Sequence, residues 1–174
     1  SDLIMHGKLN LDPSRNDRLK NTFHDSCNPA RAMGILEEPR YVIKSVCNNF
    51  YEMPRNCIRE QTFCCGCGSG LNAGEDMELR LAGGMPRGNA VKYVQDKHGV
   101  NNLICMCAID RAVLPACMGY WAPEVDVSGI NELVANALIL PGEKEKTVNL
   151  RDEQIWQKDV EPDEFYKRPR FQGR

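Results

Sequence analysis

Nine cysteines in a chain of 174 residues constrain this sequence more than any other feature. In chain order they are Cys27, Cys47, Cys57, Cys64, Cys65, Cys67, Cys105, Cys107 and Cys117. Disulfide scaffolds are typical of small secreted chains, but the count here is odd and the sequence shows no signal-peptide pattern. The adjacent pair Cys64–Cys65 is also poorly suited to an internal bond, because the required geometry is strained. The cysteines therefore favour metal or cluster binding over a disulfide framework.

The composition is that of a soluble globular domain. Hydrophobic residues make up 42% of the chain and charged residues 26%, as in folded proteins. A net charge of −2 gives no electrostatic reason to expect nucleic acid as a partner. The longest apolar stretch, residues 133–140, is much shorter than the roughly 20 residues that span a bilayer. We therefore expect a soluble domain, although it could dock onto a membrane subunit.

Short strands and helices alternate along the chain. Apolar and β-branched runs predict strands over residues 20–25, 58–63, 103–107 and 125–127. Apolar residues at helical spacing predict helices over residues 38–51, 76–82, 86–97, 109–118 and 130–138, with a break at residues 83–86. This alternation implies an α/β fold in which helices flank a mostly parallel sheet.

Cysteines gather at the ends of the predicted strands. Cys27 follows the first strand, the Cys64–Cys65 pair follows the second, and Cys105 and Cys107 belong to the third. Because ligands collect at the carboxyl ends of strands in open α/β sheets, these strand-end loops are expected to converge on one edge. Strand alternation would also place Cys105 and Cys107 on the same face.

A glycine-rich segment follows the vicinal pair. Residues 66–70 carry little side-chain bulk and permit backbone conformations that are closed to other residues. Such a loop lets backbone N–H groups approach a bulky cofactor. Gly66 and Gly68 are therefore expected to contribute donors to cluster sulfur.

Three regions of different character divide the chain. Residues 1–19 are expected to form a linker or edge segment, and residues 20–140 the cysteine-bearing domain. Residues 141–174 are rich in charge and lack apolar periodicity, which predicts an extended C-terminal arm. Both a disordered terminus and an arm that wraps a partner are open for that region. Because the sequence begins at Ser1 without a methionine, we expect a piece of a longer protein or a processed subunit.

The cysteine spacing argues against an ordinary zinc site. Zinc sites usually present two short Cys-x-x-Cys knuckles, and this chain does not carry two. It also lacks the Cys-x-x-Cys-x-x-Cys run that is typical of cubane clusters. Vicinal thiolates are better suited to a larger cluster, in which adjacent side chains reach different irons, and soft thiolates select iron–sulfur clusters.

The motifs around these cysteines resemble a known family. Three segments carry the likeness most clearly: residues 22–31 (TFHDSCNPAR), 62–66 (TFCCG) and 105–110 (CMCAID). They resemble the cysteine-rich CCG domain of heterodisulfide-reductase (HdrD-like) proteins. Within that family they are most similar to the C-terminal part of the DsrK-type subunits of sulfite-reduction membrane complexes. The likeness covers about residues 20–150, and the ordered cysteine motif makes it specific.

The resemblance implies a noncubane [4Fe–4S] cluster at which a disulfide or trisulfide is reduced. It implies Cys27, Cys64 and Cys65 as ligands, followed by a Cys-x-x-Cys pair. This chain departs from the pattern there. If Cys107 matches the first cysteine of that pair, Asp110 occupies the position of the second.

The identity of the fifth ligand is therefore open, with Cys105 and Asp110 as the two candidates. Cys105 is favoured, with Asp110 as an oxygen ligand or proton donor and Cys67 outside the set. His24 and Asp25 are candidate proton donors beside the first ligand, since histidine titrates near neutrality.

Other residues have simpler interpretations. Cys47 and Cys117 are expected in the core, because a free cysteine behaves as a small hydrophobe. Arg31 and Arg87 are expected to form surface salt bridges, although either could balance the negative charge of a cluster.

The resemblance also implies partners and a location. Electrons would come from menaquinol through membrane cytochrome and iron–sulfur subunits, with further cubane clusters in an upstream part of the protein. The acceptor would be a small sulfur-carrier protein of the DsrC type, and the domain would lie in the cytoplasm on the inner face of the cell membrane. Two rival interpretations are a structural zinc-binding interaction module and a CCG-domain electron-transfer protein for another substrate.

Overall fold

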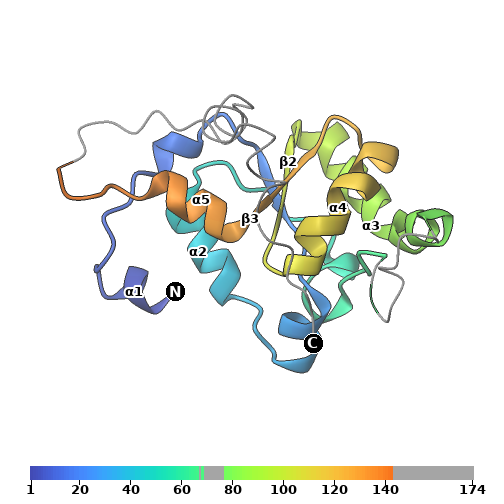
Figure 1. Ribbon diagram of the computed structural model, residues 1–174, viewed down its shortest axis with the longest axis horizontal. Coiled ribbons are helices and arrows are strands. Elements are labelled where there is room, and N and C mark those ends of the chain that lie inside the picture. The colour runs from blue at the N-terminus through green and yellow to red at the C-terminus, as the bar shows by residue number, and fades with distance from the viewer. Residues whose placement is uncertain (67, 69–76, 143–174) are drawn as a thin grey trace, which may run out of the picture. The chain divides into compact units, whose positions relative to one another are not determined.

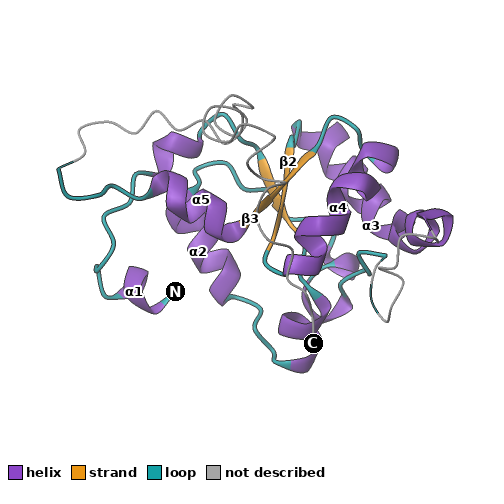
Figure 2. Cartoon of the chain, viewed as in Figure 1, coloured by secondary structure: helices purple, strands orange, loops and turns teal. Residues whose placement is uncertain are grey.

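A three-stranded parallel sheet forms the centre of the domain. In the computed structural model of the protein, residues 1–66, 68 and 77–142 are described. The strands β1 (Asn21–Phe23), β2 (Asn102–Cys105) and β3 (Asp126–Gly129) pair in the order β1-β2-β3, and both pairings are parallel. Figure 2 shows the strands together with helices on either side. The predicted α/β fold with a parallel sheet is confirmed.

The helical segments of the described residues are mostly short. In chain order they are α1 (Asp2–Met5), η1 (Pro13–Asn16), η2 (Asn28–Ala32), α2 (Glu38–Val46), η3 (Arg55–Cys57), η4 (Arg59–Gln61), α3 (Met77–His98), α4 (Ala108–Trp121) and α5 (Ile130–Ala137). No helix within the described part of the chain is long and apolar enough to cross a membrane.

Helices cover the sheet in two pairs. α2 packs with α5 on one side, and α3 packs with α4 on the other (Figure 1). Because a parallel sheet is covered on both faces, β1 and β2 are buried at every position. The main apolar cluster includes Val91 and Val94 of α3, Leu103 of β2 and Leu114 of α4.

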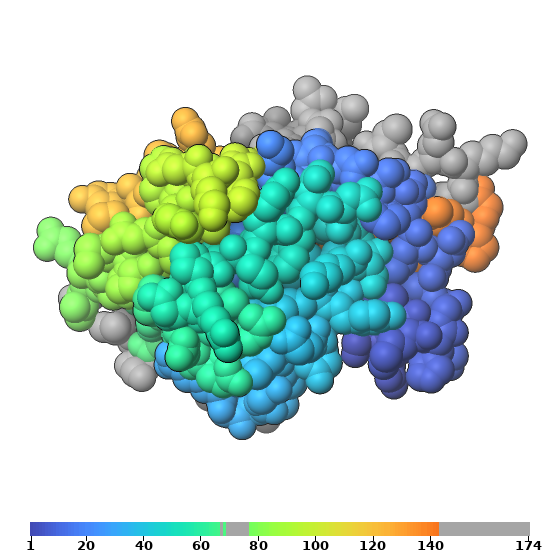
Figure 3. Space-filling view, turned by 180° about the vertical axis from the view of Figure 1, so that it is seen from behind, coloured from blue at the N-terminus to red at the C-terminus, as the bar shows by residue number. Residues whose placement is uncertain are grey.

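Residues 58–63, expected to form a strand, instead contain the 3-10 turn η4. The outer edge of β1, where a further strand would pair, is already taken by residues 49–51. Asn21 N–H donates to the carbonyl of Asn49 at 3.0 Å, and Tyr51 N–H donates to the carbonyl of Asn21 at 2.8 Å. Figure 3 shows the segments around residues 40–60, in cyan and teal, on the back of the molecule. The strand prediction was wrong because its pairing edge is occupied.

α3 runs unbroken through Pro86, although a break was predicted at residues 83–86. Gly84 allows close packing, because a Cβ atom there would lie 2.6 Å from Cys117 Sγ and 3.1 Å from the carbonyl oxygen of Cys65. Gly88 lies equally close to Trp121 of α4. The contacts with α4 therefore offset the intrinsic cost of glycine and proline inside a helix.

The structure describes the N-terminal segment of the chain but little of the predicted C-terminal arm. The described residues from 1 to 142 belong to one compact unit. Leu11, in the expected linker or edge segment, forms an isolated bridge with Leu138. The predicted C-terminal arm lies outside the described residues except for Pro141 and Gly142.

Candidate cluster-binding site

The carboxyl ends of β1 and β2 bring two cysteine-bearing segments together. β1 leads through His24 to Cys27, and β2 leads to Cys107. His24 N–H donates to the carbonyl of Ile104 at 2.9 Å, so the two segments remain side by side beyond the last paired residues. Because the strands are parallel and adjacent, both segments leave the sheet at the same edge.

The vicinal pair reaches this edge from the loop after η4. Thr62 Oγ1 donates to the carbonyl of Asp25 at 2.7 Å. Arg31 Nε donates to the carbonyl of Glu60 at 3.0 Å, and its Nη2 donates to the carbonyl of Thr62. These hydrogen bonds hold the segment before Cys64 against the segment around Cys27.

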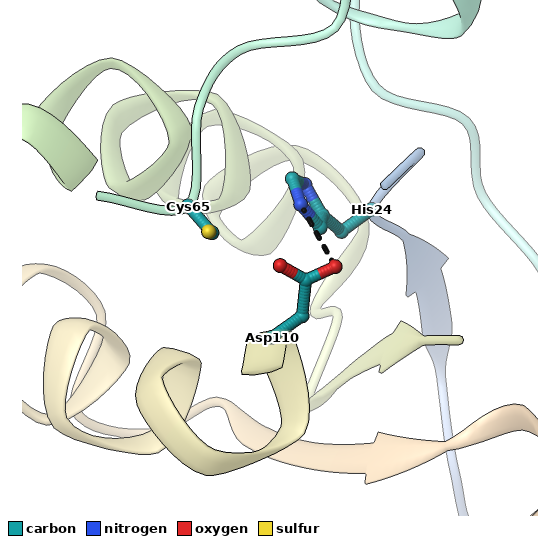
Figure 4. Close-up of side chains that lie close together, drawn as sticks. All are labelled: His24, Cys65 and Asp110. Atoms are coloured by element: carbon teal, nitrogen blue, oxygen red, sulfur yellow. Dashed lines mark ion pairs between the residues drawn. The ribbon is translucent and has the colours of Figure 1, made fainter. Parts of the chain in front are cut away.

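Three buried side chains meet at the centre of the site. His24, Cys65 and Asp110 come from the three segments, and one ligand-type atom of each lies within 4.8 Å of the others. Figure 4 shows the three side chains facing one another, with His24 Nε2 3.4 Å from Asp110 Oδ2. The group combines nitrogen, sulfur and oxygen donors.

Asp110 accepts hydrogen bonds from both of the other segments. Ser26 Oγ donates to Asp110 Oδ2 at 2.5 Å, and the side chains of His24 and Cys65 also hydrogen-bond to this carboxylate. Burial alone would raise the pKa of Asp110, but the hydrogen bonds from His24, Ser26 and Cys65 lower it below the ordinary value. Asp110 is therefore a carboxylate at neutral pH, which suits a hydrogen-bond acceptor or an oxygen ligand.

His24 is held in its neutral form. Burial is the largest cause of its lowered pKa, and the positive charge of Arg87 adds to it. Its Nε2 faces Asp110, while its buried Nδ1 has no hydrogen-bond partner among the described residues. Since Asp110 is ionised, we assign the proton of neutral His24 to Nε2.

The remaining ligand candidates are accessible at the edge of the site. Cys27 and Cys64 are exposed and Cys107 is half-buried, whereas Cys65 is buried. Gly66 N–H donates to Cys64 Sγ at 3.3 Å from a left-handed backbone conformation with φ of 90°. The observed acceptor of Gly66 N–H is thus a cysteine sulfur, and its predicted bond to cluster sulfur stays a prediction. Gly68 is exposed and its Cβ position is open.

Cys105 lies apart from this group. It is fully buried in the apolar cluster, and its Sγ lies 3.6 Å from the carbonyl oxygen of Ser128. Burial raises the pKa of its thiol to about 12, and Asp110 adds to the effect. The predicted strand over residues 103–107 was too long: β2 ends at Cys105 and Cys107 is the residue before α4, so strand alternation does not apply to this pair.

Asp25 is engaged in a buried ion pair. Its two carboxylate oxygens accept from Arg40 at 2.7 and 2.8 Å, and Glu52 lies on the other side of the same guanidinium. Burial opposes ionisation, but Arg40 and the N–H of Arg59 lower the pKa of Asp25. A carboxylate held in this way is structural and is not a ready proton donor.

Two buried arginines were not foreseen from the sequence. Arg40 and Arg87 are both essentially inaccessible, whereas Arg87 was expected at the surface. The spacing of Arg87, Val91 and Val94 on one helical stripe was the available signal. Arg31 is exposed, as expected, but it bonds to backbone carbonyls and has no carboxylate partner among the described ion pairs.

The donor set fits an iron–sulfur cluster. No two cysteines form a disulfide within residues 1–66, 68 and 77–142, so thiols remain for ligation. Accessible thiols on three segments and a backbone N–H directed at one sulfur match the soft ligands and sulfur hydrogen bonds that such clusters use. The fold and site define an α/β domain with cysteines of three loops gathered at the carboxyl edge of a parallel sheet.

Comparison with known proteins shows which family this chain belongs to. The chain is 53% identical over 144 residues to an "Hdr-like menaquinol oxidoreductase iron-sulfur subunit" of Archaeoglobus profundus, covering 83% of this chain and 26% of that protein. It is 48% identical over 157 residues to the "Hdr-like menaquinol oxidoreductase iron-sulfur subunit 2" of Archaeoglobus fulgidus, covering 88% and 28%. It is 32% identical over 141 residues to an HdrD protein, a component of the dihydromethanophenazine:CoB–CoM heterodisulfide reductase of Methanosarcina barkeri, covering 79% and 32%.

The chain is therefore an HdrD-like protein, as the cysteine motifs indicated. It spans about a quarter of the length of the first two relatives. No family model and no solved structure matches it.

Proposed function

We propose that this chain is the cluster-bearing redox domain of a membrane-associated electron-transfer complex. In this proposal the domain reduces a protein-bound disulfide or trisulfide on a small DsrC-like sulfur carrier, with electrons from menaquinol. The names of the first two relatives, which are menaquinol oxidoreductase iron–sulfur subunits, support the electron donor. The relationship to a component of heterodisulfide reductase supports disulfide chemistry.

One observation carries the proposal. A single carboxylate, Asp110, is hydrogen-bonded to Ser26 beside Cys27 and to Cys65 of the vicinal pair, and it lies three residues after Cys107. The three cysteine segments, distant in sequence, are thus held at one place.

The proposed ligands of a noncubane [4Fe–4S] cluster are Cys27, Cys64, Cys65 and Cys107. The position of Asp110 beside Cys65 supports Asp110 in the fifth position. The assignment of Cys105 to that position stays a prediction from the sequence, and its burial against Ser128 would have to change for its sulfur to reach a ligand position.

The chain's own residues would manage protons in this reaction. Reduction of a disulfide by menaquinol yields two thiols and menaquinone, so two electrons and two protons pass from the quinol to sulfur. A trisulfide takes four electrons and four protons from two menaquinols and yields two thiols and hydrogen sulfide, which carries away the central sulfur. When bound, the cluster would supply these electrons singly. Asp110 keeps the proton of His24 on Nε2. The Nδ1 atom, which has no hydrogen-bond partner among the described residues, would accept a further proton and return it to a thiolate.

Partners and location follow from the same proposal. The domain would be peripheral on the cytoplasmic face of the membrane, held by cytochrome and iron–sulfur subunits, with cubane clusters elsewhere in the full protein. The absence of a membrane-crossing helix from the described residues is compatible with this arrangement.

Two observations favour other functions. The His24–Cys65–Asp110 group has donors that zinc accepts, as a structural zinc module would require. A stretch of 68 residues of this chain is 38% identical to the "EtfAB:quinone oxidoreductase" of Syntrophomonas wolfei. This similarity favours a CCG-domain electron-transfer protein that acts on another substrate.

Rapid mixing of the anaerobically reduced chain with carrier protein separates these functions. The proposal predicts that the trisulfide form of the carrier reoxidises the reduced cluster, which is followed by its visible absorption. It also predicts that new thiols appear on the carrier. The fully reduced carrier is the matched control and should leave the spectrum unchanged. If neither form of the carrier changes the absorption of the reduced cluster, the proposed substrate is contradicted. A colourless zinc protein would contradict the redox function.

A further inference from the structure

We propose that Arg87 of α3 is a positioning residue of the candidate site. In this proposal it holds the segments of Cys27 and Cys64–Cys65 in register, and its positive charge, which forms no ion pair with the described residues, raises the reduction potential of a cluster bound at the site. The inference rests on the proposed function and deepens it.

Among the described residues, every hydrogen-bond partner of Arg87 is neutral. Its Nη2 donates to Thr62 Oγ1 at 2.7 Å and to the carbonyl of Cys57 at 2.8 Å, and its Nη1 lies 2.9 Å from Met53 Sδ. Its Nε is buried without a partner there, and the guanidinium lies 5.9 Å from the centre of the Phe63 ring. No ion pair within the described part of the chain includes Arg87.

Arg40 provides the contrast. It is as deeply buried as Arg87, yet Asp25 and Glu52 both pair with it. A buried cation without a counter-charge is costly, so natural proteins rarely keep one without a reason. Asp25 and Asp110 act on Arg87 from a distance, but no carboxylate among the described residues forms an ion pair with it, so a thiolate-bound cluster would add to its negative surroundings.

Thr62 transmits the position of Arg87 to both cysteine segments. Its hydroxyl accepts from Arg87, so its single proton is available to donate to the carbonyl of Asp25 at 2.7 Å. Thr62 lies two residues before Cys64, and Asp25 lies two residues before Cys27. One guanidinium thus orients the approach of two proposed ligand segments to the sheet edge.

The charge of Arg87 persists and is felt at the site. Burial lowers the pKa of Arg87 to about 10, so it remains protonated at neutral pH. Its positive charge interacts with Cys57 and Asp25 and, at the site, with Asp110 and Cys65, and it helps to lower the pKa of His24. A nearby positive charge stabilises the more negative, reduced state of a cluster, and this raises the reduction potential.

A redox titration of the full chain tests the charge. Arg87→Met removes the charge, and Arg87→Lys keeps it without the planar donors. The control Lys92→Met removes a charge from an exposed position of the same helix. We expect a lower midpoint potential for Arg87→Met and wild-type values for Arg87→Lys and Lys92→Met. An unchanged potential in Arg87→Met, or an equal shift in Arg87→Lys, would overturn the inference. If Arg87→Met does not fold, Arg87→Gln replaces it with the same expectation.

Substitution of Thr62 tests the positioning role separately. Thr62→Val removes the hydroxyl relay and leaves the charge, so the chain should retain less iron after gel filtration while the potential of the remaining cluster stays the same. Thr62→Ser should restore the iron. Full retention of iron in Thr62→Val would overturn the positioning role. A wild-type chain that binds no cluster would overturn the proposed function and this inference together, whereas unchanged variants of a loaded wild type would overturn this inference alone.

Discussion

Ser26 Oγ donates to Asp110 Oδ2 across 2.5 Å, linking the residue before Cys27 to the first turn of α4. The two residues lie 84 positions apart in the sequence. Cys65 and His24 hydrogen-bond to the same carboxylate. Asp110 therefore links the segments of Cys27 and Cys65 whether or not it binds iron.

Gly66 should be intolerant of substitution. A Cβ atom at this position would overlap the carbonyl oxygen of Arg80 and lie 2.9 Å from Gly84 N, and the positive φ adds strain. We expect Gly66→Ala to lower the free energy of unfolding by about 1–3 kcal/mol and to reduce the iron content. Gly68→Ala, where the Cβ position is open, is the control and should change neither. Urea denaturation and iron analysis provide the measurements. Equal behaviour of the two variants would show that close packing does not fix this loop.

Accessible cysteines should be needed for the cluster, and core cysteines should not. Cys27→Ser and Cys64→Ser should lose most of the bound iron, because exposed thiols at the site are proposed as ligands. Cys47→Ala is the matched control, since burial raises the pKa of the Cys47 thiol to about 12 and keeps it unavailable as a thiolate. Iron and labile sulfide per folded chain give the comparison. Loss of iron in Cys47→Ala, or its retention in Cys27→Ser, would be incompatible with the ligand set.

The fifth ligand can be decided by a pair of variants. If Asp110 has this role, Asp110→Ala should lose iron or change the electron paramagnetic resonance spectrum of the cluster, while Cys105→Ala should keep both. The structural reason is that Asp110 lies beside Cys65 and Cys105 lies in the apolar core. The reverse pattern would support the assignment of Cys105 made from the sequence. Circular dichroism establishes that both variants are folded before iron is counted.

His24 should make the stability of the cluster-free chain depend on pH. Its folded-state pKa is lowered from 6.5, chiefly by burial, so below that pH the unfolded chain binds a proton that the folded chain excludes. The free energy of unfolding should therefore fall as the pH decreases from about 7.5 to about 5.5, by at most about 1.4 kcal/mol per pH unit. His24→Asn should flatten this dependence. Parallel stability curves for wild type and variant would contradict a neutral, buried His24.

Much of the fold was predictable because its signals are local. The apolar run from residue 103 and the helical spacing over 109–118 indicate β2 and α4, and the alternation of elements indicates a parallel sheet. The errors at residues 58–63 and 83–86 have tertiary causes. The edge of β1 is filled by residues 49–51, and the glycines of α3 are needed for packing against α4.

The site was predictable in its segments but not in its contacts. The cysteine order located the three loops, and His24 and Asp110 were found as their neighbours. The link from Arg87 through Thr62 to Asp25 was not visible, because helical spacing can indicate that Arg87 faces the core but not which atoms its guanidinium contacts. Cys105 and Cys107 belong to different elements because β2 ends at Cys105, and sequence patterns locate the ends of strands poorly.

Iron and acid-labile sulfide, counted per chain after anaerobic purification, decide whether this domain is a cluster protein. We predict a brown protein with about four irons and a similar number of sulfides, because thiolates of three loops are proposed to hold one [4Fe–4S] cluster. One zinc per chain with no labile sulfide would contradict this prediction.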